Sequence, residues 1–511
     1  MQETINSILG NIDDFVWGPP LIILIMCGGI LLTIRLKGMQ FKQLPRALRY
    51  MFKNEEGGKG EVSSFGALCT ALSATIGTGN IVGVATAVCA GGPGAIFWMF
   101  VAACFGMATK YAEGLLAIKY RTVDDDGHVL GGPFYYIERG MSSIKCLKWG
   151  GSWKWLAKIF ALFGALAGLL GIGTLTQINS INGALNELID PAEASIAFNL
   201  FGIDYTWTTV IASIIVAVLV GLVVIGGLQR IANVTTVVIP AMVVFYIVLC
   251  GMVVVCNFTR IPEAICEICY AAFNPAAVTG GAVGSLIIAM QKGVARGIFS
   301  NEAGLGSAPI AAAAAQTHEP VRQGLVSMTG TFIDTIIVCT LTGLTIVLTG
   351  AWDPALGLEG SAVTMYAFGE GIPFLPVIVS NTLLTIALVL FGFTTILGWN
   401  YYSERCVEYL TNGKMGVVKV FRWLWIVATF VGPYISISAV WTIADILNGL
   451  MAIPNMIALI ALSGVVAKTT KDYFTRLKNG EIIEYPEKEA KKAAKQQAKA
   501  ASASCEANLP A

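Results

Sequence analysis

The sequence predicts an all-α protein that crosses a membrane about eleven times, and its composition and the spacing of its charges carry this prediction. Hydrophobic residues make up 55% of the 511 residues and charged residues only 13%, whereas an ordinary soluble domain carries about 25% charged residues. Charge-free windows of about 20 residues, the length that a spanning helix needs, recur along the chain. The sequence has no basic patch with interleaved aromatic residues outside its C-terminal tail, which argues against a nucleic-acid partner.

The charge-free windows place the spanning segments. The first lies between Asp14 and Arg35, and the long window from Glu61 to Lys110 holds two segments, which "AGGPG" at residues 90–94 separates. Further charge-free windows lie at 158–187, 204–230, 230–260, 373–400 and 453–467, and apolar segments that hold a few charged residues lie at 282–316, 324–350, 418–433 and 436–451. Pro433 and Pro454 can each either kink one helix or separate two, so the boundaries near the end stay open at this point, and the count is eleven if one helix crosses Pro454.

The loops alternate in charge, which predicts the orientation of the chain. Lysine and arginine gather in loops 35–63 and 119–154, whereas loops 1–18, 187–206 and 351–372 hold acidic residues and no lysine or arginine. The positive-inside rule therefore places the N-terminus outside and the C-terminus in the cytoplasm. An odd number of spans requires the same arrangement. No basic region precedes the first apolar run, so we expect no cleavable signal peptide and a multi-pass protein of the cell (plasma) membrane.

The same pattern predicts the organisation of the chain. Residues 1–14 form an extracellular N-terminus, 15–34 an extra transmembrane helix and 35–63 a cytoplasmic loop. The remaining ten spans divide into two five-helix repeats, at 64–257 and 282–467. The Ala/Lys-rich segment 468–511 is a cytoplasmic tail, which is either solvated or in contact with anionic lipid.

The first helix of each predicted repeat is interrupted by one stretch. The stretch is "ATIGTGNIVG" at residues 74–83 in the first repeat and "FSNEAGLGSAP" at 299–309 in the second. An unwound helix frees backbone N–H and C=O groups, which the membrane tolerates only where they line a cavity or find a partner. Paired interruptions at corresponding positions of two inverted halves indicate the binding site of a transporter. Half-helix N-termini suit a carboxylate and half-helix C-termini suit a cation, the two charges of an amino acid. The alternative for Gly-x-Gly alone is close helix packing.

Four motifs together resemble a known family. They are "GTGNIVGVATA" at residues 77–87, "GGPGAIFWMF" at 91–100, "GGPFYYIERG" at 131–140 and "FSNEAGLGSAPIAAAAA" at 299–315. The chain resembles the alanine or glycine:cation symporters, the sodium:alanine symporter family, from about residue 15 to 467. Phe100 is a local departure, because many members carry Trp there. The resemblance implies the leucine-transporter-like fold of two inverted five-helix repeats, uptake of alanine or glycine, and coupling to Na+.

The two interruptions supply the candidate substrate site. We expect Thr78, Gly79 and Asn80 near the substrate carboxylate, with Asn80 also capping the second half-helix. Ser300, Asn301 and free carbonyls up to Gly304 are expected to receive the amino group, and Ser307 to cap the half-helix that follows. Two further residues, Thr174 and Gln177, share a helix face at i, i+3 spacing and either line the cavity or form interhelical hydrogen bonds.

The candidate cation site is inferred from the resemblance. In this type of fold a pair of hydroxyls completes a Na+ site with carbonyls of the first broken helix, which places Na+ near Ala74, Gly77, Thr394 and Thr395. Oxygen ligands suit Na+ but do not by themselves select it over a proton.

Two carboxylates lie at membrane depth, where a charge is costly and indicates function. Glu302 either accepts N–H bonds from the unwound loop or binds a cation or proton. Asp334 is either a cation ligand or part of a polar network. Among the other charges, Lys110 and Glu113 are expected to pair at the inner end of a span, while Arg296 either shapes an outer gate or reaches the headgroups.

These observations predict a Na+-coupled symporter of alanine and/or glycine that works by alternating access. It would need no cofactor besides the coupling ion Na+ and no ATP, because the chain has no Gly-Lys-Ser/Thr loop. The rivals are a proton-coupled carrier and a glutamine-preferring carrier of the same fold. A membrane-embedded enzyme is disfavoured because the chain has only two histidines, His128 and His318, both in predicted loops. A channel is disfavoured because paired broken helices imply an enclosed site.

Overall fold

The computed structural model describes residues 2–53, 55, 58–125, 127–144, 152–192, 194–200, 203–274, 284–435 and 437–482. The chain divides into two compact units at Ser463 and Gly464. The first unit is a bundle of helices that holds both interruptions. The second holds the end of the last helix, and most of the predicted tail 468–511 lies outside the described residues.

The first half of the bundle is helical apart from two hairpins. Its elements are α1 (Gln2–Val16), α2 (Pro19–Arg35), α3 (Met39–Lys42), α4 (Leu44–Met51), α5 (Ser64–Thr75), the 3₁₀ turn η1 (Thr78–Asn80), α6 (Val82–Gly91), α7 (Gly94–Lys119), strands β1 (Thr122–Val123) and β2 (Val129–Leu130), α8 (Pro133–Tyr135), the π-helical turn η2 (Tyr136–Gly140), α9 (Lys154–Leu170), α10 (Leu175–Ile189), strands β3 (Ile196–Leu200) and β4 (Ile203–Thr206), α11 (Trp207–Val224) and α12 (Gly227–Cys256). Both hairpins are antiparallel.

The second half follows a short connection, the 3₁₀ turn η4 (Phe258–Arg260) and α13 (Ile261–Phe273). Its elements are α15 (Gly284–Asn301), α16 (Ala308–Ala313), α17 (Pro320–Thr331), the π-helix η5 (Phe332–Cys339), α18 (Thr340–Thr349), η6 (Pro354–Leu356), α19 (Ser361–Gly371), α20 (Val377–Leu410), α21 (Met415–Val431), η7 (Gly432–Tyr434) and α22 (Ile437–Lys478). The start of the predicted repeat at residue 282 lies outside the described residues.

Nine of the described helical segments are long and apolar enough to cross a membrane. A tenth is the pair Ser64–Thr75 and Thr78–Gly91, which bends by 62° at the first interruption. This number of apolar helices and the composition make the chain a multi-pass membrane protein.

The structure settles the two prolines that the sequence left open. Pro433 lies in η7 and separates α21 from α22. Pro454 lies inside the continuous helix α22, so the windows 436–451 and 453–467 belong to one helix. A third interruption was not predicted: α9 ends at Leu170 and α10 begins at Leu175, with the glycines of "GIGT" between them.

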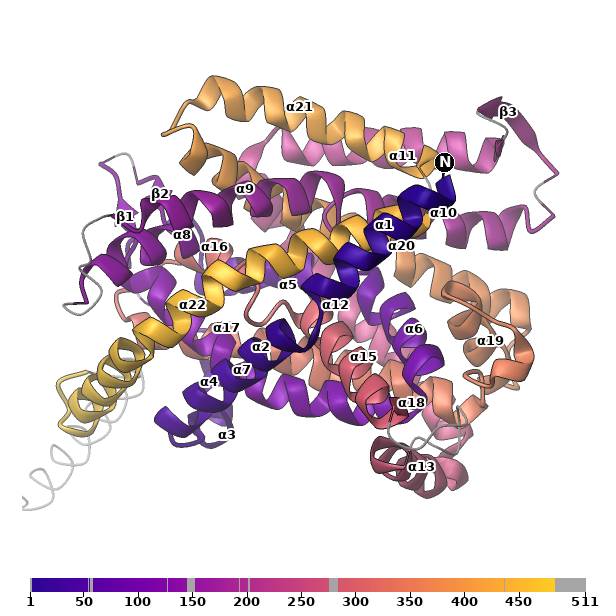
Figure 1. The fold of residues 1–511 in the computed structure, drawn as a ribbon, viewed down its shortest axis with the longest axis horizontal. Coiled ribbons are helices and arrows are strands. Elements are labelled where there is room, and N and C mark those ends of the chain that lie inside the picture. The colour runs from indigo at the N-terminus through magenta and orange to yellow at the C-terminus, as the bar shows by residue number, and fades with distance from the viewer. Residues whose placement is uncertain are drawn as a thin grey trace, which may run out of the picture. The chain divides into compact units, whose positions relative to one another are not determined.

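The predicted outer and inner loops gather at opposite ends of the bundle (Figure 1). The N-terminus, β3 and α19 lie at one end, whereas the β1–β2 hairpin and α8 lie at the other. This grouping matches the charge alternation of the loops, since every acidic loop named above lies at the first end.

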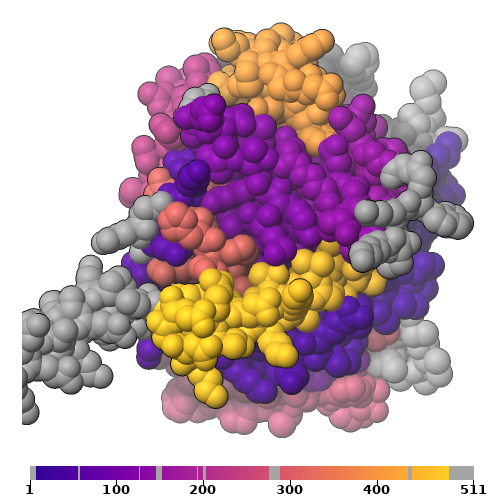
Figure 2. All heavy atoms as spheres, turned by 90° about the vertical axis from the view of Figure 1, so that its left-hand side faces the viewer, coloured from indigo at the N-terminus to yellow at the C-terminus, as the bar shows by residue number. Residues whose placement is uncertain are grey.

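Buried scaffold helices hold the interrupted ones in place. The helix α7 packs along α15, α16 and α17, and α20 packs along α5, α9 and α10. At the β1–β2 end the guanidinium of Arg121 donates to the carbonyls of Ala315, at 2.6 Å, and Thr317, at 2.9 Å. Figure 2 shows this end, where the salmon segment that follows α16 lies at the surface beside purple residues of the first half of the chain.

Candidate substrate and sodium site

The first interruption is a short extended stretch between two half-helices. The helix α5 ends at Thr75, Ile76 and Gly77 are extended, and η1 leads into α6. The side-chain oxygen of Asn80 accepts the Gly77 N–H at 2.9 Å. Asn80 therefore closes the turn, and it does not cap α6, which has no side-chain cap.

One freed donor of this stretch is taken by α10. Gln177 Oε1 accepts the Thr78 N–H at 3.2 Å and the Thr78 hydroxyl at 3.0 Å, while its Nε2 donates to the Ile172 carbonyl at 3.0 Å. Thr174 does not share this role. Thr174 stands at the N-cap of α10, and its hydroxyl donates to the Leu169 carbonyl at 2.6 Å, so it bonds to the end of α9 and not to the first interruption.

The second interruption is built from left-handed backbone. The φ angles of Glu302, Gly304 and Gly306 are 55°, 94° and 82°, a region that glycine enters at no steric cost. The half-helix α16 then begins at Ala308. Ser307 stands at its N-cap position but makes no side-chain cap, because its hydroxyl donates to Glu302 Oε2 at 2.5 Å.

Glu302 and Glu113 both accept hydrogen bonds at this loop, but from different kinds of donor. Glu302 accepts side-chain donors, Trp399 Nε1 at 2.8 Å and the Ser307 hydroxyl, and not the backbone N–H groups that were expected. The backbone is held by Glu113, whose Oε1 accepts the Gly304 N–H at 3.1 Å and Asn455 Nδ2 at 2.7 Å. Asn455 Nδ2 also donates to the Gly304 carbonyl at 2.9 Å.

This role of Glu113 was not predicted from the sequence, whose i, i+3 spacing paired it with Lys110 instead. Lys110 Nζ has no hydrogen-bond partner, and Glu113 Oε2 has none. The signal available in the sequence was the position of Glu113 within the apolar helix at 94–119. A carboxylate there is costly to bury and indicates a functional or structural role.

Asp334 joins the two interruptions. Its Oδ1 accepts Asn80 Nδ2 at 2.6 Å, and its Oδ2 accepts the hydroxyls of Ser300, at 2.9 Å, and Thr335, at 2.6 Å. Asn301 belongs to the same network, since its Nδ2 donates to the Thr335 hydroxyl at 3.0 Å. All these side chains are buried. The carboxylate lies on the π-helix η5, a local widening that is frequent at functional sites.

The residues proposed for Na+ converge only in part. The hydroxyl of Thr395 donates to the Ile76 carbonyl at 3.4 Å, and a Cβ on Gly77 would lie 2.5 Å from that hydroxyl. Ala74 lies against Gly398 on the same face of α20. Thr394 bonds to the Leu390 carbonyl of its own helix and contacts Met242 of α12. The buried oxygens beside Gly77 thus come from Ile76 and Thr395, a chemistry that suits Na+.

Aromatic rings and an ion pair close the α15 side of this site. Phe299 packs near Gly79, with ring atoms 3.5 Å from where a Cβ would stand, and its ring centre lies 5.7 Å from that of Trp441. The guanidinium of Arg296 lies over both rings and pairs with Asp445 at 3.2 Å. Arg296 therefore points into the bundle and does not reach toward the headgroups.

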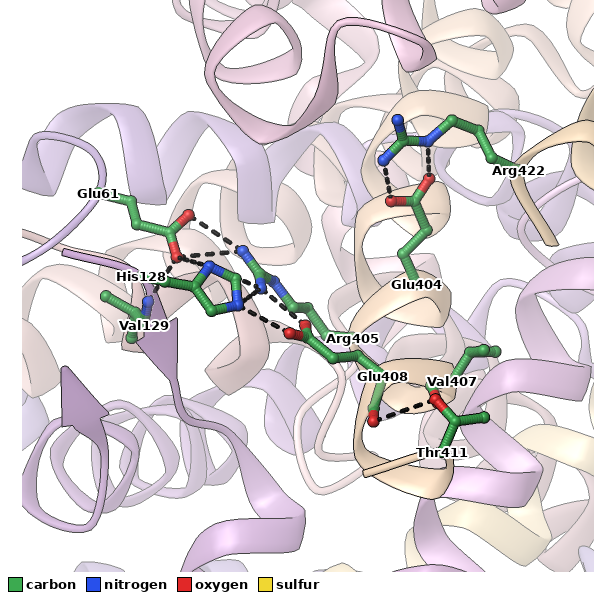
Figure 3. Close-up of polar contacts among 9 residues, drawn as sticks. All are labelled: Glu61, His128, Val129, Glu404, Arg405, Val407, Glu408, Thr411 and Arg422. Carbon is green, nitrogen blue, oxygen red and sulfur yellow. Dashed lines mark hydrogen bonds and ion pairs between the residues drawn. The ribbon is translucent and has the colours of Figure 1, made fainter. Parts of the chain in front are cut away.

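A second charged cluster lies beside the β1–β2 hairpin (Figure 3). Arg405 pairs with Glu61 at 3.0 Å and Glu408 at 2.8 Å, and the His128 ring lies between the same carboxylates, at 3.3 Å and 2.7 Å. Hydrogen bonds with Glu408 and Glu61 raise the pKa of His128 from 6.5 to about 9. Burial raises the pKa of Glu61, but the His128 hydrogen bond and the Arg405 charge outweigh it and leave that pKa lowered.

With His128 protonated, two cations balance two carboxylates. The cluster ties together the segment before α5, the β1–β2 hairpin and the end of α20. These elements can separate only if several ion pairs break together.

Known proteins match this chain along nearly its whole length. The sodium:alanine symporter family matches residues 2–487. An uncharacterized transporter of Haemophilus influenzae is 54% identical over 476 residues, 93% of this chain and 97% of that protein. The sodium/alanine symporter AgcS of Methanococcus maripaludis is 46% identical over 478 residues, 93% of this chain and 98% of that protein.

Among solved structures, the crystal structure of MhsT in complex with L-phenylalanine is similar to this one, with a TM-score of 0.51 and 13% identity. The match covers 80% of this chain and 98% of that chain. At this identity the likeness is one of fold alone.

Proposed function

Since the chain belongs to the sodium:alanine symporter family, we propose that it is a secondary transporter that carries alanine and/or glycine into the cell together with Na+. One observation carries the proposal from the structure: two interrupted helices meet at a buried polar network, and Asp334 accepts hydrogen bonds from both of them. Because Asp334 bonds to both breaks, a movement of either one changes the position of the groups that bind the substrate at the other.

We assign the substrate to the space between the two breaks. Thr78, Gly79 and Asn80 bind its carboxylate, while Ser300, Asn301 and the backbone at Gly304 bind its amino group. Gln177 holds Thr78 in place, whereas Thr174 acts only as a cap of its own interruption. The ring of Phe299 packs against Gly79, and we infer that it limits the size of the substrate side chain, which favours alanine and glycine over glutamine.

We assign Na+ to the oxygens beside Gly77, supplied by Ile76, Thr395 and the carbonyl of Ala74. Thr394 joins this set only after its hydroxyl turns from its own helix. Glu302 is structural and keeps the second break in shape, and Asp334 couples the cation and the substrate because it accepts hydrogen bonds from both breaks.

The proposed architecture is the leucine-transporter-like arrangement of two inverted five-helix repeats, 64–257 and 282–467, after an extra helix at 15–34. The fold likeness to MhsT supports it. Eleven spans result when α15 and α16 are counted as one span beside the nine apolar segments and the bent pair. The loop charges support an outer N-terminus and a cytoplasmic C-terminus.

Alternating access then requires that the two ends open in turn. The cluster of Arg296 and Asp445 seals the outer end and the cluster of Glu61, His128, Arg405 and Glu408 seals the inner end. In this proposal, a conformation in which both clusters are formed is the occluded state of the cycle.

The test is uptake of radiolabelled alanine into proteoliposomes, with Na+ or choline outside. The variants are Asn80→Ala, which removes the bond to Asp334, and Asn233→Ala, an exposed asparagine on α12 that serves as the control. We expect saturable, Na+-dependent uptake in the wild type and the control, and its loss in Asn80→Ala.

Other outcomes point to the rivals. Uptake that follows a proton gradient without Na+ replaces Na+ coupling by proton coupling. Competition of glutamine with alanine at equal concentration indicates a glutamine-preferring carrier. Wild-type vesicles that take up none of these amino acids refute the proposed substrate.

A further inference from the structure

A small cavity lies beside α16, the half-helix that follows the second break. Its volume is about 20 Å³, and its walls come from α5, α7, α16 and α17. Most of the wall is apolar, with alanines and leucines from α5 and Ala308, Pro309 and Ala312 from α16. Besides the hydroxyls of Thr75 and Ser327, three larger polar side chains line it: Lys110, Glu113 and Gln323.

These three side chains are buried and incompletely bonded. Their exposed fractions are 3%, 0% and 1%. Lys110 Nζ, Glu113 Oε2 and Gln323 Oε1 each lack a hydrogen-bond partner. An unpaired polar group costs free energy in such a place, and an unpaired charge costs more, so three such atoms around one cavity indicate a bound ligand.

The chemistry of the three atoms selects the ligand. A monovalent cation would face the Lys110 ammonium, and an anion would face two oxygen acceptors, so both are repelled by part of the site. A water molecule fits, because its oxygen accepts from Lys110 while its two O–H groups donate to Glu113 and Gln323. The volume agrees, since a water needs roughly 10–15 Å³ of such space and two to four polar partners.

The cavity is connected to the second break through Glu113. The other oxygen of this carboxylate, Oε1, accepts the Gly304 N–H and Asn455 Nδ2. A carboxylate that is buried at this depth stays ionised only beside a compensating charge, and Lys110 stands one helical turn before it. We propose that Lys110, Glu113 and Gln323 bind one water molecule, and that through this water Lys110 positions the carboxylate that holds the second break.

Lys110 is therefore a positioning residue that touches neither substrate nor Na+. Its effect on transport rests on the proposed function, whereas its coupling to Glu113 can be measured without any substrate. Removing either charge alone leaves the other one buried and uncompensated, and removing both leaves neither. If Lys110 only filled space, removing the Glu113 carboxylate would not restore the stability that is lost in Lys110→Met.

The experiment is a double-mutant cycle on the full-length protein in detergent. Thermal unfolding midpoints are compared for the wild type, Lys110→Met, Glu113→Gln and the double variant, with Lys158→Met, an exposed lysine on α9, as the control. We expect each single variant to lower the midpoint and the double variant to lie closer to the wild type than Lys110→Met does. Shifts that simply add in the double variant overturn the coupling.

Two further readouts keep the inference testable if a single variant does not fold. A high-resolution structure of the wild type is expected to contain an ordered water within hydrogen-bond distance of Lys110 Nζ, Glu113 Oε2 and Gln323 Oε1, and its absence overturns the water site. In proteoliposomes, alanine uptake rates are expressed relative to the wild type. The relative rate of the double variant is expected to exceed the product of the two single-variant rates by about threefold or more. If the wild type takes up no alanine, the proposed function fails, while the midpoints and the water still decide this inference.

Discussion

The substitution Asp334→Asn tests the central link between the two interruptions. The carboxylate accepts three short hydrogen bonds, from Asn80, Ser300 and Thr335. An amide of the same size keeps one oxygen but presents an NH₂ group to at least one of these donors. One bond to a charged acceptor is then lost, at a cost of about 1.5–3 kcal/mol, and the other two weaken by about 1 kcal/mol each as the charge disappears.

The sum is about 4 kcal/mol, which corresponds to roughly a thousandfold change in an equilibrium constant. Relaxation of the buried network reduces this value, so we expect the apparent affinity for alanine and Na+ to fall at least about a hundredfold. The assay is the initial rate of alanine uptake into proteoliposomes over a range of Na+ and alanine concentrations.

The control is Asp125→Asn, which removes the same charge from an exposed loop. An unfolding midpoint for each variant separates a binding defect from a folding defect. If Asp334→Asn binds Na+ and alanine within about threefold of the wild type while folding normally, Asp334 does not couple the breaks and the reasoning fails.

The other two predictions concern Gly77 and His128. Gly77→Ala places a Cβ 2.5 Å from the Thr395 hydroxyl and is expected to abolish the stabilisation of the protein by Na+ in thermal unfolding, whereas Gly83→Ala, with no heavy atom within 4 Å, preserves it. The pKa of His128 is raised from 6.5 to about 9, so its stabilising effect is complete below the lower value and is lost as pH rises through the higher one. The difference in unfolding midpoint between the wild type and His128→Ala is therefore expected to shrink from about pH 6 to about pH 10, and a constant difference contradicts this role.

Local patterns in the sequence were sufficient to find most of the long apolar helices that the structure describes and the first two interruptions. Two glycines flank Thr78, and two flank Leu305. An apolar segment that unwinds at glycines inside a membrane must line a cavity or find partners for its freed backbone groups. The four motifs were sufficient to predict the family, which the family match confirms. Local spacing also predicted that Gln177 lines the cavity or forms an interhelical hydrogen bond, and its bonds to Thr78 are of the second kind. Thr174 bonds instead to the end of α9, across an interruption that the pattern did not reveal.

The partners of the buried charges were decided only by tertiary structure. Glu113 was expected to pair with Lys110, its neighbour along the helix, but it bonds to Gly304, 191 residues away. Asp334 reaches Asn80 across 254 residues. Sequence spacing describes neighbours on one helix, whereas a buried carboxylate is satisfied by whichever donors the packing of other helices brings to it.

The same division applies to the hydroxyl pair Thr394 and Thr395. Adjacent residues on a helix point about 100° apart, so only one of the two can face a given neighbour. Thr395 faces the first interruption and Thr394 faces α12. The sequence alone determined that this chain breaks two helices inside a membrane, because backbone conformation depends on local residues. Which side chains meet at those breaks depended on how distant helices pack, because burial, and not proximity in the chain, decides which polar groups must find one another.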